Sequence, residues 1–97
     1  MKSIVSLQNV DGSWSPSDTF SLLIIKASVD IPLSPPDEFA PFLNQEVRSI
    51  AWVSVLALWL LERYCSAQKN EWKRIGAKGT NFLLEQGIVL KEALSLI

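Results

Sequence analysis

The sequence has no histidine, only one cysteine and no proline after Pro41. Without histidine, the chain cannot form Ser-His-Asp or Cys-His nucleophile systems, and the usual zinc ligand sets are excluded with them. The single Cys65 cannot form a disulfide within the chain, which favours a reducing compartment and a cytoplasmic location. We therefore expect a protein with no catalytic residues, no cofactor and no metal site.

Charge of either sign and long apolar runs are also scarce. Nine basic and ten acidic residues give a net charge of -1, so there is no overall attraction to nucleic acid or anionic lipid. The basic residues concentrate in 48–97, which carries seven of them, whereas 1–47 carries two. The longest apolar run, 50–61, falls short of the ~20 residues that span a bilayer. We expect neither direct nucleic-acid binding nor membrane insertion.

Hydrophobic residues make up 48% of the 97 residues, which is enough for one core and a single domain, 1–97. The prolines divide it into a loop-rich part, 1–43, and a helical part, 44–97. Asn44 is a suitable N-cap for a helix through Ser66 that is apolar around its whole circumference, as expected of a helix buried on several sides. The predicted fold is all-α, a compact bundle of four or five helices around a central helix, 44–66.

Three further helices follow from periodicity and capping signals. A short helix is expected at 3–8, and a second begins with Ser15 as N-cap and Pro16 in the first position, ending near residue 27 or 28. The third covers 69–86 and stops at Gly87. Its interior glycines, Gly76 and Gly79, each cost about 1 kcal/mol relative to alanine, which predicts close approach of a neighbouring helix.

Several apolar residues lie at the edges of this predicted core. Phe39 and Phe42 are expected to pin the proline-rich loop to the core, and the aliphatic tail 88–97 must either cover the core or contact a partner. Trp14 is either a core residue or a surface anchor. The candidate partner-binding residues are Trp14, Ile31, Leu33, Ile88, Leu90 and Leu94.

A turn lies where the first helix is expected to end, at Gln8-x-x-Asp11-Gly12-x-Trp14. This spacing resembles the glutamine-tryptophan repeats of squalene and terpene cyclases, in which a turn joins the helices of an α/α barrel. The segment 78–86 echoes the first half of that repeat. The chain is too short to close such a barrel and has no acidic DxDD box. A fragment of a cyclase-like protein is therefore one alternative.

A second resemblance runs through residues 4–87 in order. It rests on Leu7-Gln8 with Asp-Gly-Ser-Trp at 11–14, Leu-Leu-Ile at 22–24, the tryptophan-rich segment 52–60, Glu71-Trp72, and 77–83. Together these resemble the C-terminal region of intracellular von Willebrand factor A domain-containing proteins related to vault poly(ADP-ribose) polymerase. The resemblance implies a non-catalytic domain that binds the major vault protein and recruits cargo to the vault ribonucleoprotein particle. A self-association module forming a homo-oligomer is a further alternative.

Overall fold

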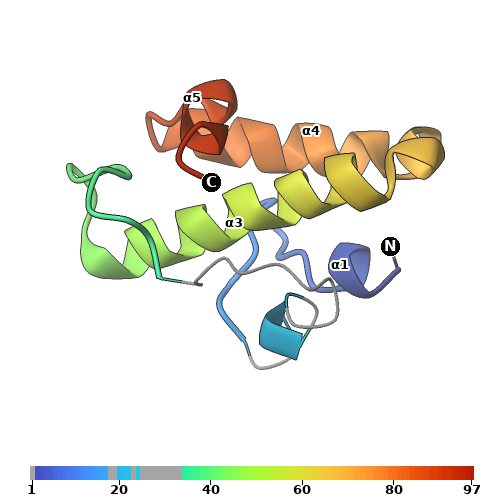
Figure 1. The fold of residues 1–97 in the computed structure, drawn as a ribbon, viewed down its shortest axis with the longest axis horizontal. Helices are drawn as coiled ribbons and strands as arrows, with labels where there is room; N and C mark the ends of the chain where they lie inside the picture. Colours follow the sequence, from blue (N-terminus) through green and yellow to red (C-terminus); the bar gives the residue numbers. More distant parts are fainter. Residues whose placement is uncertain (1, 18–19, 23, 25–33) are drawn as a thin grey trace.

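The computed structural model describes residues 2–17, 20–22, 24 and 34–97, which form helices and turns with no strand among them. The helices, shown in Figure 1, are α1 (Lys2–Ser6), α3 (Gln45–Tyr64), the short 3-10 helix η1 (Ser66–Gln68), α4 (Lys69–Glu85) and α5 (Leu90–Leu94). Residues 20–22 and 24 are helical as well. The predicted all-α fold is confirmed.

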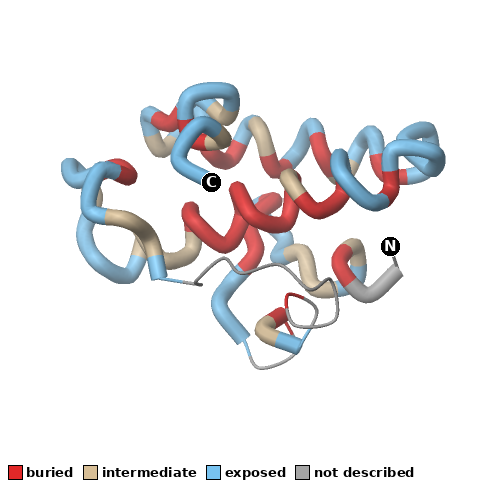
Figure 2. Tube along the Cα trace, viewed as in Figure 1, coloured by how far each residue is buried: buried red, intermediate tan, exposed pale blue. Residues whose placement is uncertain are grey.

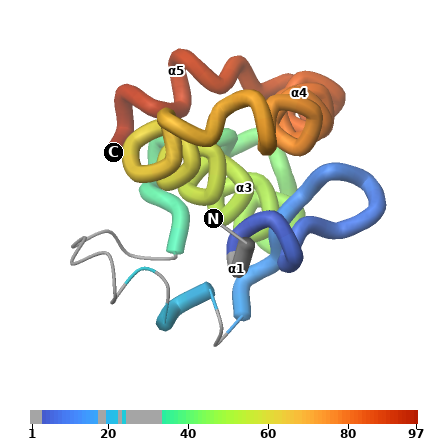
Figure 3. The backbone as a smooth tube through the Cα atoms, turned by 90° about the vertical axis from the view of Figure 1, so that its right-hand side faces the viewer, coloured from blue at the N-terminus to red at the C-terminus, as the bar shows by residue number. Residues whose placement is uncertain are grey.

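Helix α3 lies between two groups of elements. Helices α4 and α5 lie on one side of it, and α1 with the rest of the N-terminal segment lies on the other (Figures 1 and 3). Residues 51–58 of α3 are all buried, as the continuous red stretch in Figure 2 shows. Apolar side chains from both sides join them in one core, among them Trp14, Phe39 and Leu83.

The ends of the two long helices follow local capping chemistry. The side chain of Asn44 accepts a hydrogen bond from the Val47 amide at 2.9 Å, as expected of an N-cap, but α3 ends at Tyr64, two residues before the predicted end. Helix α4 ends at Glu85, one residue before its predicted end. Gly87 follows with φ +82°, and the Ile88 amide donates to the Leu83 carbonyl at 2.9 Å, which closes a Schellman motif.

The predicted cap at Ser15 is wrong. The hydroxyl of Ser17 accepts a hydrogen bond from the Phe20 amide at 3.1 Å and so caps the helical turn at 20–22. Ser15 is instead a partner of the Asn9 amide group, which donates to its hydroxyl at 2.9 Å. The predicted end of this helix, near residue 27 or 28, lies outside the described residues. Helix α1 ends at Ser6, two residues before its predicted end.

The loop before α3 is held by one phenylalanine rather than two. Phe39 is buried, with its ring centroid 5.1 Å from that of Trp52. Phe42, predicted to do the same, is 66% exposed. The chain reverses between them, because Ala40 has a positive φ of 43° and its carbonyl accepts a hydrogen bond from the Leu43 amide at 3.0 Å. The reversal places Phe42 at the surface.

The interior glycines of α4 permit close approach, as predicted, but chiefly of tryptophan rings and not of a neighbouring helix. A Cβ added to Gly79 would lie 2.9 Å from the Trp14 ring and 3.4 Å from Leu58 of α3. A Cβ added to Gly76 would lie 3.0 Å from the ring of Trp72 in the same helix. The glycines therefore make room mainly for two tryptophan rings, and α3 is the more distant contact.

Candidate functional site

The Gln8 to Trp14 corner forms a hydrogen-bonded turn against α4. The Gln8 side-chain amide donates to the Gly12 carbonyl and to the Ile75 carbonyl of α4, both at 3.0 Å. The carboxylate of Asp11 accepts hydrogen bonds from the Ser13 hydroxyl at 2.6 Å and from the Ser13 amide at 2.9 Å. The Ser13 hydroxyl, followed by the Ser13 amide, lowers the pKa of Asp11 below its ordinary value. These bonds join the corner to a helix far along the chain.

Trp14 lies at the centre of this packing. It is 0% exposed, its indole Nε1 donates to the Ile4 carbonyl at 2.8 Å, and its amide donates to the Ser54 hydroxyl at 2.8 Å. Ser54 is itself buried in α3 and donates to the Ile50 carbonyl. Of the two roles open to Trp14, the structure places it in the core, where it joins α1, α3 and α4.

The other candidate residues lie in different parts of the chain. Ile88 is buried in the core. Leu90 and Leu94 are half-buried on α5 and line a cavity beside α4, about 300 Å³ in volume. Ile31 and Leu33 lie outside the described residues. The structure therefore brings Leu90 and Leu94 together at one cavity, which Trp14 does not line.

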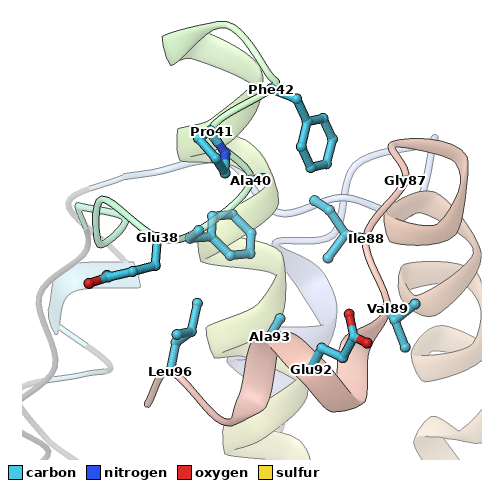
Figure 4. Close-up of a pocket in the computed structure, with 11 residues that line it drawn as sticks. Glu38, Ala40, Pro41, Phe42, Gly87, Ile88, Val89, Glu92, Ala93 and Leu96 are labelled. Carbon is cyan, nitrogen blue, oxygen red and sulfur yellow. The ribbon is translucent and has the colours of Figure 1, made fainter.

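A second cavity, of about 290 Å³, lies where the loop before α3 faces the tail. Its apolar lining comes from Phe39, Ala40 and Phe42 on one side and from Ile88, Val89 and Leu96 on the other. We call these residues the Phe42 groove. Phe42 is 66% exposed, Val89 47% and Leu96 39%, so the groove opens to solvent along an apolar edge (Figure 4). Among the described residues that line it, Glu38 and Glu92 are the charged ones, and they lie on opposite sides of it.

Each wall of the Phe42 groove has its own support. The Arg48 guanidinium donates to the Phe39 carbonyl at 3.0 Å and to the Pro36 carbonyl at 2.9 Å, which ties the loop to α3. This anchor matters because Ala40 has φ 43°, a left-handed conformation that costs a residue with a side chain about 1–2 kcal/mol. The Schellman motif at Gly87 directs the opposite wall. The groove is thus held in shape by the fold around it.

Sequence reasoning missed Phe42, Val89 and Leu96 as surface residues. The sequence predicts that Phe42 packs against the core, and of the tail it singles out Ile88, Leu90 and Leu94 rather than Val89 and Leu96. The residue pattern carries a signal for the tail, since Gly87 ends α4 and allows the chain to turn back toward the loop. The residue pattern carries no signal for the exposure of Phe42. That exposure depends on the chain reversal at Ala40, where φ is positive, and alanine does not indicate a positive φ.

The described residues contain no group of three His, Cys, Asp or Glu side chains placed to hold a metal ion. In the same part of the chain, no single helix has both the length and the apolar character to cross a bilayer. Helix α3 and the segment Ser66–Glu85, which are bent by 91° at the break between them, pass that test only as a pair.

Comparisons of this chain with models of protein families, with curated proteins and with solved structures find no match.

Proposed function

We propose that this chain is a non-catalytic protein-binding domain and that the Phe42 groove is its docking surface. The observation that carries the proposal is the exposure of Phe42, an aromatic side chain left 66% in solvent beside an apolar cavity. Aromatic residues next to apolar pockets commonly supply much of the affinity of protein interfaces. Covering Phe42, Val89 and Leu96 with a partner would remove this apolar surface from water.

The partner we propose is the major vault protein, with the domain recruiting cargo to the vault particle in the cytoplasm. This identity rests on the resemblance of residues 4–87 to the vault-binding region of proteins related to vault poly(ADP-ribose) polymerase. The free Cys65, which is buried, fits a reducing compartment. Binding would proceed by packing of apolar side chains without a chemical step.

Both walls of the Phe42 groove are held in place by the fold. Arg48 holds the loop wall, and the Schellman motif holds the tail wall, so little ordering would be needed when a partner arrives. Pre-ordered surfaces bind more tightly because less conformational entropy is lost. Glu38 and Glu92 at the edges would favour a partner segment with basic residues beside its apolar ones.

Co-sedimentation with assembled vaults tests the proposal. The wild-type chain should sediment with vaults, and Phe42→Ser should weaken binding by about tenfold or more, as expected for an exposed aromatic anchor that the partner buries. Val10→Ser is the matched control, because Val10 is 92% exposed but lies on the Gln8 to Trp14 corner. Equal binding by the two variants, or no binding by the wild type at low salt, would overturn the proposal.

The same groove could instead pair two copies of the chain. Light scattering of the wild type over a range of concentrations separates the two cases. A dimer that Phe42→Ser dissociates and Val10→Ser does not would assign the groove to self-association. A monomer at all concentrations leaves the groove free for a different protein.

A further inference from the structure

The cavity beside α4 and α5 differs in character from the Phe42 groove. Its apolar lining includes Leu58 of α3 and Trp72 of α4, which are buried, and Leu90 and Leu94 of α5, which are half-buried, and we call this cavity the Trp72 groove. The indole Nε1 of Trp72 donates to the Cys65 carbonyl at 2.7 Å, which fixes the ring in place. Gly76 leaves space for that ring, since a Cβ there would lie 3.0 Å from it. The cavity has a volume of about 300 Å³.

The mouth of the Trp72 groove carries excess positive charge. Lys69, Lys73 and Glu62 are its charged lining residues. The Lys69 ammonium lies 3.3 Å from the Glu62 carboxylate, so these two charges offset each other. Lys73 is exposed and has no hydrogen-bond or ion-pair partner within the described part of the chain. One positive charge therefore remains beside an apolar surface, where the Phe42 groove has two negative charges.

We propose that the Trp72 groove binds a free, single-chain anionic amphiphile with a carboxylate head, such as a medium-chain fatty acid. The acyl chain would lie along Trp72, Leu90 and Leu94, and the carboxylate would pair with the Lys73 ammonium. A single uncompensated positive charge matches a monoanion better than a dianionic phosphate. The volume lies at the lower end of the range for small-molecule sites, about 300–1,000 Å³, which favours a short chain. This site is separate from the proposed protein-docking surface and does not depend on it.

The probe is decanoate, used below the concentration at which it forms micelles, with calorimetry for affinity and NMR for position. Saturable binding should shift the signals of the Trp72 indole and of the Leu58, Leu90 and Leu94 methyl groups. Raising the salt concentration should weaken decanoate binding, because salt screens an exposed ion pair. Lys73→Met should weaken decanoate binding by about two- to fivefold, the range of an exposed ion pair. Lys91→Met is the matched control, because Lys91 is exposed on α5 but lies outside the groove lining.

A second variant tests the apolar surface without altering charge. Ala77 is exposed and lines the groove, so Ala77→Phe should fill its mouth and abolish decanoate binding while the thermal melt stays cooperative. The proposal is overturned by the absence of saturable binding, by a decanoate affinity that does not change with salt, or by equal effects of Lys73→Met and Lys91→Met. Phe42→Ser should leave decanoate binding unchanged, so failure of the vault proposal and failure of this one are distinguishable.

Discussion

Gly12 and Gly87 both have positive φ angles, 95° and 82°, but they differ in the space around them. A Cβ added to Gly12 would lie 2.5 Å from the Lys78 carbonyl oxygen, which belongs to the backbone of α4 and cannot move aside. A Cβ added to Gly87 would meet only the Phe42 ring, at 3.5 Å, an ordinary contact distance. At Gly12 the backbone conformation and the close approach both require glycine, whereas at Gly87 only the conformation does.

The two glycines therefore form a matched pair. Gly87→Ala should lower the free energy of unfolding by about 1–2 kcal/mol, the cost of the left-handed conformation. Gly12→Ala should lower it by at least about 3 kcal/mol, because overpacking against α4 adds to that cost. Urea unfolding measures both variants. If Gly12→Ala were no more costly than Gly87→Ala, the corner would not be held tightly against α4.

Asp11 provides a pH-dependent test of the same corner. Hydrogen bonds from the Ser13 hydroxyl and amide lower the pKa of Asp11 in the folded chain below its ordinary value of 3.8. A lowered pKa means that ionised Asp11 stabilises the fold above the ordinary value and that this stabilisation disappears as the pH falls through the lowered one. Asp11→Asn should therefore be less stable than the wild type above pH 3.8, and the difference should shrink below it. Urea unfolding on both sides of that pH checks the sign, and a difference independent of pH would contradict it.

For individual residues, hydrogen bonds to near neighbours in the sequence were predictable, and contacts with distant residues were not. The turn at Asp11 and Gly12 follows from residues that hydrogen-bond to near neighbours, as Asp11 does with Ser13. The partner of Gln8 is the carbonyl of Ile75, on a helix far along the chain, and no local pattern specifies it. The burial of Trp14 depends equally on distant groups, namely Ser54 and the glycine at position 79.

The helices themselves were the most predictable elements. Helix α4 begins at its predicted residue and α3 begins directly after its predicted cap, and both end within two residues of the predicted ends, because caps and glycine stops act over a single turn. The predicted cap at Ser15 is wrong because the Ser15 hydroxyl accepts a hydrogen bond from the Asn9 side chain. The Ser17 hydroxyl, two residues later, caps the helix instead. The loop before α3 was the least predictable, since its shape depends on the reach of Arg48 from the next helix.

Arg48 gives a prediction at the scale of this loop. Arg48→Ala removes charged hydrogen bonds to the Pro36 and Phe39 carbonyls and should cost about 1–3 kcal/mol. Hydrogen exchange should become faster at the Phe39 and Leu43 amides, which are bonded within the loop, and vault binding should weaken. Arg63→Ala is the control, because Arg63 is exposed at the other end of α3 and lies over the Trp59 and Tyr64 rings. Unchanged loop exchange in Arg48→Ala would show that the anchor is dispensable.

The described part of the molecule has two apolar cavities whose edges carry charge of opposite sign. The Phe42 groove has Glu38 and Glu92 at its edges, and the Trp72 groove has an unbalanced Lys73. Both are built with residues of the tail after Gly87, which packs its two sides against different parts of the fold. The sequence predicts that the tail either covers the core or contacts a partner, but the division of its residues between two surfaces depends on the positions of α3, α4 and the loop together.

The most direct test of the docking surface places a photo-crosslinking side chain, p-benzoylphenylalanine, at position 42 and, in a separate variant, at position 10. Both positions are highly exposed, so both groups would be accessible before binding. After illumination with purified major vault protein, we expect a crosslinked product from position 42 and none above background from position 10. Equal crosslinking from the two positions, or none from position 42, would contradict the assignment of the Phe42 groove as the docking surface.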